Sequence, residues 1–348
     1  MSGREGIGSG QGRAVAVFGA TGHTARFVMA ELQRRGFRPV AVARKGAKLA
    51  ALWDSERGIE IREASADDPS GLDRALAGTA AVINCAGPFL DTADAVASAA
   101  IRAAIHYLDV TAEQPSARAT FERHDRAARD AGVVVIPAMG FYGGFADLLA
   151  TAAMGDWDAA DEITIGIALD SWRPTLGTRI TGERNTARRV VVADSHLVPL
   201  PLPAAERSWD FPAPFGGQAM TELPFSETIV IARHLRVAGL HTYLNHTALR
   251  DIRDESTPPP AAADESGRSA QCFAVEAIVR RAGRTRRAVA EGRDIYAFSA
   301  PLLCEAVERI LGGQARDVGA QAPGAIFDAE DFLWSLVPDT LTVRLSDR

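Results

Sequence analysis

The sequence predicts a doubly wound α/β domain with a parallel sheet, joined to a second, mostly antiparallel α+β domain. Over the first 150 residues, short apolar runs alternate with amphipathic segments, which is the pattern of parallel strands connected by covering helices. After about residue 150 strand-like runs follow one another without regular helices between them. The length of 348 residues also favours two domains, at roughly 150 residues each.

Six short runs rich in apolar and β-branched residues are predicted as the parallel strands. They cover 14–18, 39–43, 58–62, 80–84, 107–110 and 133–137. In the first intervening segment, Ala25, Val28, Met29 and Leu32 share one helical face, and Gly36 ends that helix. Further helices are predicted at 45–53, 70–77, 91–104 and 114–131. Right-handed crossovers then place helices on both faces of the sheet.

The second part is predicted from strand-like runs and one hairpin. The runs are 162–169, 188–193 and 228–231, and the hairpin pairs 271–280 with 285–290 around a turn at 282–283. A loop rich in Pro, Ala and acidic residues covers 256–268, and helical spacing resumes at 302–311.

The loop after the first predicted strand has the spacing of a dinucleotide-binding loop. It reads Gly19-Ala20-Thr21-Gly22-His23-Thr24-Ala25. Gly19 allows the tight turn, Gly22 lets the backbone approach a pyrophosphate, and Ala25 is small enough for close packing of helix on strand. The helix N-terminus offers free N–H groups to the phosphates. A Rossmann nucleotide site is therefore predicted, with an ordinary βα turn as the alternative. The predicted cofactor contacts here are Gly19, Thr21, Gly22, His23, Thr24 and Ala25.

The end of the second predicted strand indicates which cofactor binds. NAD-preferring sites carry an acidic residue there, about 20 residues after the glycine loop, to bind the ribose 2′-hydroxyl. This sequence has Arg44 and Lys45 instead, with Lys48 behind them. A guanidinium and an ammonium suit a 2′-phosphate, so NADP is predicted in preference to NAD. The alternative is a solvated charge cluster at the start of a helix.

The ends of the next three strands are expected at the same crevice, because the carboxyl ends of parallel strands share one edge. After the fourth strand, Asn84, Ala86, Gly87 and Pro88 are predicted to contact the cofactor. Cys85 is not predicted as a nucleophile, since no neighbouring charge would lower the pKa of its thiol.

Three residues are candidates for acid–base catalysis. Asp109 and Glu113 follow the fifth strand, and Tyr142, in a glycine-rich aromatic loop after the sixth, is the most plausible proton donor. Each has a structural alternative: Asp109 satisfying loop amides, Glu113 starting the next helix, and Tyr142 packing in an interdomain turn.

Four of these segments together resemble the saccharopine dehydrogenase-like oxidoreductases. They are 19–25, 82–89, 107–113 and 140–148, and 292–296 also looks like the segment by which that family's chain re-enters the nucleotide domain. The resemblance implies a Rossmann domain with an inserted α+β domain. The predicted division is a flexible arm at 1–12, an NADP-binding domain at 13–155, a substrate or dimerisation domain at 156–292, and a returning segment at 293–348.

The resemblance also implies an activity: NADP-dependent hydride transfer to or from a C=N bond or an activated C=C bond of an unidentified small molecule. The sequence departs from the family's motifs at Ala112, Tyr142 and Phe145, which argues against saccharopine itself as the substrate. There are two alternatives to this activity. One is an NADP-binding sensor without turnover, and the other is an epimerase-like enzyme that keeps its cofactor. Arg179 and Arg184 are candidates to bind a substrate carboxylate, with an exposed turn as the alternative.

Composition excludes several other chemistries. Only two of the 38 basic residues, Lys45 and Lys48, are lysines. No tyrosine has a lysine four residues on, so a Tyr-x-x-x-Lys mechanism is not expected. Schiff-base chemistry needs a buried lysine, and both lysines lie beside the predicted phosphate site, so it is not expected either. The histidines form no ligand cluster, so no metal is expected. A net charge of −6 argues against nucleic-acid binding. Three cysteines and no long apolar run lead us to expect a cytoplasmic protein without a membrane span. A homodimer is compatible with this, and the oligomeric state stays open.

Overall fold

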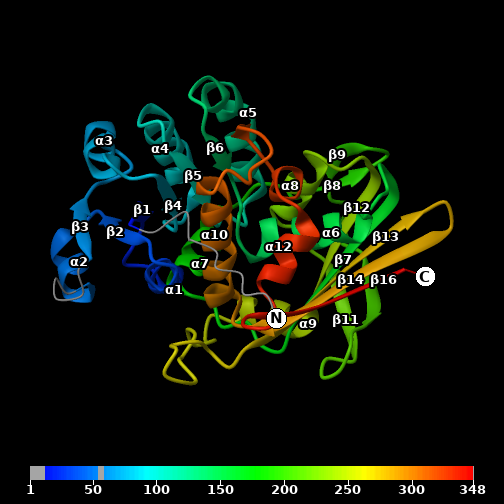
Figure 1. Ribbon diagram of the computed structural model, residues 1–348. Coiled ribbons are helices and arrows are strands. Elements are labelled where there is room, and N and C mark those ends of the chain that lie inside the picture. The colour runs from blue at the N-terminus through cyan, green and yellow to red at the C-terminus, as the bar shows by residue number, and fades with distance from the viewer. Residues whose placement is uncertain (1–11, 54–58, 348) are drawn as a thin grey trace, which may run out of the picture.

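Two sheets organise the fold (Figure 1), and the computed structural model describes residues 12–53 and 59–347. The first sheet has seven strands in the order β15-β6-β5-β4-β1-β2-β3, and every pair in it is parallel. Its strands are β1 (Ala14–Phe18), β2 (Arg38–Ala43), β3 (Glu60–Glu63), β4 (Ala81–Asn84), β5 (His106–Asp109), β6 (Val134–Ile136) and β15 (Gly319–Ala320). The predicted doubly wound sheet is confirmed.

Helices cover both faces of this sheet. They are α1 (His23–Arg34), α2 (Gly46–Leu52), α3 (Pro69–Leu76), α4 (Phe89–Arg102), α5 (Gln114–Asp130) and the later α10 (Ile295–Leu311). The buried residues of α1, α2 and α10 belong to one apolar core, and those of α3, α4 and α5 belong to another. The predicted apolar face of α1, from Ala25 to Leu32, is fully buried.

The second sheet has nine strands and is mostly antiparallel. Along its main path the order is β10-β11-β12-β7-β13-β14-β16, and only β7 and β12 pair in parallel. Its strands are β7 (Ala160–Leu169), β8 (Val190–Ala193), β9 (His196–Pro199), β10 (Glu206–Asp210), β11 (Gly217–Glu222), β12 (Val237–Asn245), β13 (Cys272–Arg281), β14 (Arg284–Arg293) and β16 (Leu341–Asp347). The predicted hairpin is β13–β14, and both turn residues, Ala282 and Gly283, have positive φ.

The remaining helices lie around the second sheet. They are α6 (Ala146–Met154), α7 (Leu176–Arg184), α8 (Glu227–Ala232), α9 (His246–Arg253), α11 (Pro323–Ile326) and α12 (Ala329–Ser335). Helix α6 packs on β13 and β14, and α12 packs on α6. None of the helices within the described ranges is long and apolar enough to cross a membrane.

Three expectations differ from the structure. The strand predicted at 228–231 lies in helix α8, because a short apolar run that is buried on all sides has no periodicity to separate strand from helix. The glycine-rich loop after β6 is a π-helical turn, η2 (Phe141–Phe145), that continues into α6. Strand β15 was not predicted, since two residues leave no pattern.

The C-terminal stretch 293–348 is shared between the two sheets. Helix α10 packs on α1, β15 joins the parallel sheet, and β16 pairs with β14 of the second sheet. The N-terminal arm predicted at 1–12 lies outside the described residues apart from Gly12.

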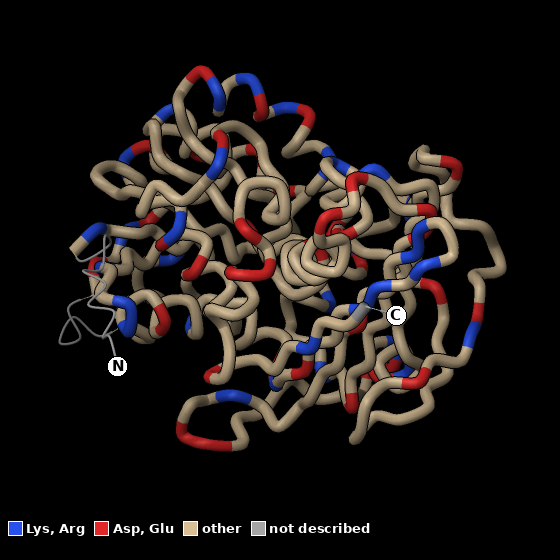
Figure 2. The backbone as a smooth tube through the Cα atoms, turned by 45° about the vertical axis from the view of Figure 1, so that its right-hand side comes forward, with Lys and Arg blue, Asp and Glu red and all other residues tan. Residues whose placement is uncertain are grey.

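Arg35 ties the returning helix to the first helix of the chain. Its guanidinium binds Glu31 of α1 at 2.7 Å, and Glu305 and Glu308 of α10 at 2.6 and 2.7 Å. These carboxylates outweigh the effect of burial and raise the pKa of Arg35. In the view of Figure 2, acidic and basic residues are interspersed over the molecule rather than gathered on separate faces.

An aromatic cluster joins the two parts of the molecule. Phe298 of α10 lies 4.7 Å from Phe145 of η2 and 5.2 Å from Phe273 of β13, between ring centroids. Phe141 packs on Phe273 at 4.8 Å. Phe145, Phe273 and Phe298 are completely buried, so this cluster links η2, the second sheet and the returning helix.

We expect Phe298→Ala to lower the free energy of unfolding by about 3–5 kcal/mol, because it leaves a cavity where three elements meet. Urea denaturation followed by circular dichroism would measure the loss. Leu202→Ala, at an exposed leucine, is the control and should change stability by less than about 0.5 kcal/mol. Equal losses in the two variants would contradict the role given to the cluster.

Candidate functional site

In the glycine loop, the backbone at Gly19 lies close to the backbone of the turn after β4, at the edge of the parallel sheet. Gly19 has φ +82°, and a Cβ there would lie 2.8 Å from the Cβ of Ala86. The N–H groups of Gly19 and Ala20 donate to the carbonyl of Val42 at 2.8 and 3.1 Å. Gly22 is the N-cap of α1, and no side chain caps the helix. The first N–H groups of α1 are therefore available to a phosphate, as the sequence predicts.

His23 provides a test of whether a nucleotide fits this loop. Its Nδ1 lies 2.9 Å from the guanidinium of Arg26, while its Nε2 is buried and has no hydrogen-bond partner in the described part of the chain. Burial, and then Arg26, lower the pKa of this histidine. A buried ring nitrogen without a hydrogen-bond partner is uncommon in folded proteins. A phosphate or ribose group beside the loop would supply that partner, so the residues present fit a dinucleotide.

The predicted 2′-phosphate residues are exposed and unpaired. Across residues 12–53 and 59–347, the side chains of Arg44 and Lys45 make no hydrogen bond or ion pair. The loop itself is held by Glu63, whose carboxylate accepts the N–H of Gly46 at 2.9 Å. Two exposed cations, with no partner among the residues that the structure describes, thus stand at the end of β2.

The turn after β4 is held by Asn84, whose side chain is completely buried. Its Oδ1 accepts the N–H of Ala86 at 2.9 Å, and its amide nitrogen donates to Thr92 and Tyr107 at 3.2 and 3.3 Å. Its observed role is to shape the turn. Burial raises the pKa of the neighbouring Cys85 thiol to about 12, which agrees with its exclusion as a nucleophile.

The two candidate carboxylates bind backbone amides. Asp109 is fully buried and accepts the N–H groups of Thr111 and Ala138, at 2.9 and 2.8 Å, and the hydroxyl of Tyr107 at 2.8 Å. Burial raises its pKa to about 6, although the hydrogen bonds oppose that shift. Glu113 accepts the N–H groups of residues 89 and 90 at the start of α4. The contacts of Asp109 correspond to its structural alternative, whereas Glu113 binds the start of α4 rather than that of the helix that follows it, α5. A role of either residue in proton transfer stays a prediction.

Tyr142 does not reach a cavity in this conformation. Its ring lies between Phe225, at 4.2 Å, and Trp172, at 5.4 Å between centroids. Its hydroxyl is buried without a hydrogen-bond partner in the described part of the chain, and burial raises its pKa well above the ordinary value. Its neighbour Trp172 lines the cavity described next, whereas Tyr142 does not.

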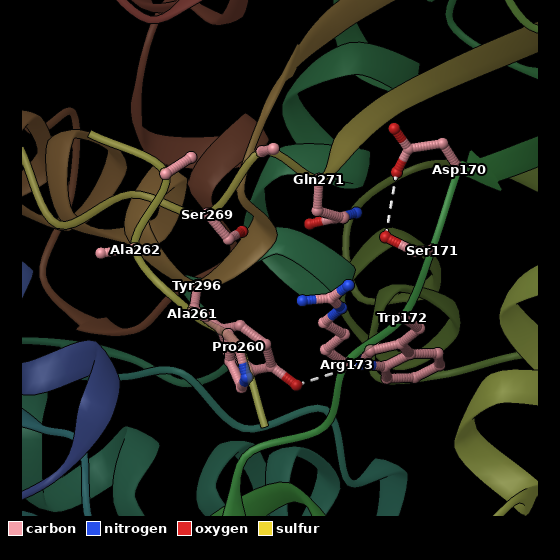
Figure 3. A pocket seen from close by; sticks show the side chains of 12 residues that line it. Asp170, Ser171, Trp172, Arg173, Pro260, Ala261, Ala262, Ser269, Gln271 and Tyr296 are labelled. Atoms are coloured by element: carbon pink, nitrogen blue, oxygen red, sulfur yellow. Dashed lines mark hydrogen bonds between the residues drawn. The ribbon is translucent and has the colours of Figure 1, made fainter. Parts of the chain in front are cut away.

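A cavity of about 260 Å³ lies at the first turn of α10 (Figure 3). It is lined by the segment after β7, the loop before β13 and the first turn of α10. Tyr296 forms part of its wall, and the ring of Tyr296 packs edge-on against His23 at 5.6 Å. In Figure 3 the guanidinium of Arg173 points into this space, and it makes no ion pair with any residue that the structure describes.

The hydroxyl of Tyr296 is held in place by three groups. It accepts the indole N–H of Trp172 at 3.0 Å and the N–H of Thr175 at 3.4 Å, and it lies 3.0 Å from the Thr178 hydroxyl. Sequence reasoning placed Tyr296 only in the returning segment and overlooked Trp172 and Arg173. The single available signal was the Asp294-Ile295-Tyr296 start of a helix.

The predicted substrate arginines lie on α7 but do not meet. Arg184 binds Asp91 of α4 at 2.8 Å, and Arg179 donates to the carbonyls of Asp254 and Thr257. Neither lines the cavity. Thr181 lies over the turn after β4, because a Cβ on Gly87 would lie 2.9 Å from its hydroxyl. Helix α7 therefore crosses the crevice. One anchor is the Arg184–Asp91 ion pair, and the other is Arg179 on the carbonyls of residues 254 and 257.

Comparison with known families identifies the first part of the chain. Residues 15–136 match the family model described as the saccharopine dehydrogenase NADP binding domain. The predicted resemblance is confirmed. An Arabidopsis thaliana protein described as a probable mitochondrial saccharopine dehydrogenase-like oxidoreductase is 29% identical over 143 residues. That match covers 36% of this chain and 31% of the relative, so the chain matches less than a third of the relative's length.

The fold as a whole also resembles a solved structure of the same type. Saccharopine dehydrogenase (L-Glu forming) from Saccharomyces cerevisiae superposes with a TM-score of 0.68, covering 96% of this chain and 100% of that one. The sequence identity is 13%, so this likeness concerns the fold alone.

We expect Asp109→Asn to alter the pH dependence of stability. A carboxyl whose pKa is raised to about 6 in the folded state contributes stability below the pKa of the unfolded chain, and that stability is lost as the pH rises through 6. The wild-type free energy of unfolding should therefore fall, relative to the variant, by about 2–3 kcal/mol between pH 4 and 7. Urea denaturation across this range measures the difference. Glu122→Gln, at an exposed carboxylate on α5, serves as the control, and parallel profiles for Asp109→Asn and wild type would refute the expectation.

Proposed function

We propose that this protein is an NADP-dependent oxidoreductase. It would transfer a hydride between the nicotinamide and a C=N bond or an activated C=C bond of a small molecule in the cavity of Figure 3. One observation carries the proposal: the glycine loop, with its free helix N-terminus and unpartnered His23, adjoins that cavity through Tyr296. The match to an NADP-binding domain supports the choice of cofactor class.

The chain's own residues would hold and orient the reactants. Gly19, Gly22 and the first turn of α1 would bind the pyrophosphate, and Arg44 with Lys45 would bind the 2′-phosphate. When bound, the cofactor supplies or accepts the hydride, and the protein excludes water and positions the partner. Helix α7, which crosses the crevice, is placed to cover the reacting groups.

Tyr296 is better placed than Tyr142 to move the proton that accompanies the hydride. Its side chain lines the cavity, whereas Tyr142 does not line it and has a buried hydroxyl. Burial raises the pKa of Tyr296, but the N–H groups of Trp172 and Thr175 both donate to its oxygen and oppose that shift, as donors that stabilise a phenolate do.

Binding of NADPH, followed by its fluorescence, tests the cofactor assignment. Arg44→Asp should weaken NADPH binding relative to NADH by about tenfold or more, because it replaces a charge-assisted contact with repulsion. Arg126→Asp, at an exposed arginine on α5, is the control and should leave the ratio unchanged. Absence of NADPH binding at millimolar concentration would overturn the proposed function.

Oxidation of NADPH against a panel of imines and enoyl compounds tests the reaction. With any substrate found, Tyr296→Phe should lower kcat by about a hundredfold or more while leaving NADPH binding intact, and Tyr142→Phe should have a much smaller effect. A larger loss of kcat in Tyr142→Phe than in Tyr296→Phe would assign the role of proton donor to Tyr142. NADPH binding without turnover would favour the sensor, and product formation without net NADPH loss would favour an epimerase-like enzyme.

A further inference from the structure

A second pocket, of about 320 Å³, lies away from the nucleotide crevice. It is formed by the start of β8, the segment after β9, the end of β11 and helix α9. Its walls combine aliphatic side chains, among them Leu200, Leu223 and Leu249, with three arginines, Arg188, Arg189 and Arg253.

The charges in this pocket are unbalanced. The one lining carboxylate, Glu222, is engaged by His241, whose Nδ1 lies 2.6 Å away. Arg188 donates only to the carbonyl of Leu200, and the guanidinium of Arg253 makes no hydrogen bond or ion pair to the described residues. Among the residues that the structure describes, none of the three lining arginines forms an ion pair with a carboxylate.

Arg189 differs from the other two arginines because it is half-buried, whereas Arg188 and Arg253 are exposed. Its one hydrogen bond within the described chain goes to the carbonyl of Pro224, at 2.5 Å. Burial lowers its pKa, an effect that Glu227 opposes. Glu227 is itself completely buried, and burial raises its pKa to about 7, an effect that Arg189 opposes. Buried cations in proteins are ordinarily paired. Within the described chain Arg189 pairs with no carboxylate, and its guanidinium has donors left for a further acceptor.

We propose that this pocket binds a small organic anion with an aliphatic tail. Arg188, Arg189 and Arg253, which all line the pocket, would hold its acid group, because guanidinium groups match carboxylate and phosphate oxygens. The leucines would cover its tail and remove apolar surface from water. Carboxylates and phosphate monoesters share this chemistry, and the volume suits a small ligand.

The two pockets are joined by a stack of four side chains. The guanidinium of Arg189 lies 4.8 Å from the centroid of Phe225, Phe225 lies 4.2 Å from Tyr142, and Tyr142 lies 5.4 Å from Trp172. Trp172 forms part of the wall of the first cavity. An anion on Arg189 would therefore fix one end of a stack whose other end faces the proposed reaction site.

Calorimetric titration of the full chain with octanoate and with octyl phosphate tests the proposal. At least one should bind saturably, and acetate and octanol should bind much more weakly, because each lacks half of the recognised chemistry. The tighter of the two anions identifies a carboxylate or a phosphate ester as the favoured acid group. No saturable binding of either at millimolar concentration would overturn the proposal, as would equal binding of octanol.

Substitutions locate the site. Arg189→Gln and Arg253→Gln should each weaken binding by about tenfold or more, since each removes a charge-assisted contact. Arg250→Gln lies on the same helix as Arg253 but outside the pocket, and should leave binding unchanged. Equal weakening by Arg250→Gln would show a general charge effect and contradict the site. Arg253 is exposed, so its variant remains informative even if Arg189→Gln does not fold.

A parallel NADPH titration on the same samples separates this proposal from the proposed function. Loss of NADPH binding would count against the oxidoreductase and leave the anion site standing. Loss of octanoate and octyl phosphate binding with NADPH binding intact would do the reverse.

Discussion

The buried carboxylate of Asp109 is the interaction on which the site depends. It joins the ends of two neighbouring parallel strands, because it accepts N–H groups from Thr111 after β5 and from Ala138 after β6. The backbone of Asp109 adds a third link by accepting the N–H of Met139 at 2.6 Å. The chain leaves this junction directly into η2, and so the positions of Tyr142, the aromatic cluster and α6 all follow from it. A carboxylate serves here because the amides converge on one point that only an acceptor can satisfy.

The crevice is closed by contacts between segments that are distant in sequence. Tyr296, at the start of the returning helix, meets His23 of the first glycine loop and Trp172 of the second sheet. Helix α7 is held across the crevice through Arg184 and Asp91, an exposed pair of the kind that contributes little free energy. Arg179 and Thr178 add hydrogen bonds to the carbonyls of residues 254 and 257 and to Tyr296, and no residue of α7 is buried. The helix is therefore attached by polar contacts, which suits a site that must admit and release a large cofactor.

The sequence predicts the parallel sheet, the glycine loop and the β13–β14 hairpin, because each has a local signal: strand–helix alternation, glycine spacing, or a turn that requires positive φ. It does not distinguish α8 from a strand, since a short run buried on every side shows neither period. Nor does it reveal the wall of the cavity. Trp172 and Tyr296 are separated by 124 positions, and only the packed fold brings them together. Asp109 and Glu113 were found as polar residues at strand ends, and loop amides were foreseen as partners of Asp109. The partners of Glu113, the N–H groups at the start of α4, were not foreseen, because only the packed fold brings them together.

The scarcity of lysine has a practical consequence for the loop after β2. Lys45 and Lys48 are exposed and carry all the side-chain amines of the chain, since the other basic residues are arginines. Amine-directed reagents are therefore confined, among side chains, to the edge of the crevice where the adenosine end of a dinucleotide would lie. A chromophore attached there would stand beside a bound nucleotide without touching the arginine networks that hold the helices. The scarcity of lysine thus makes covalent labelling of side-chain amines specific to the edge of the proposed nucleotide site.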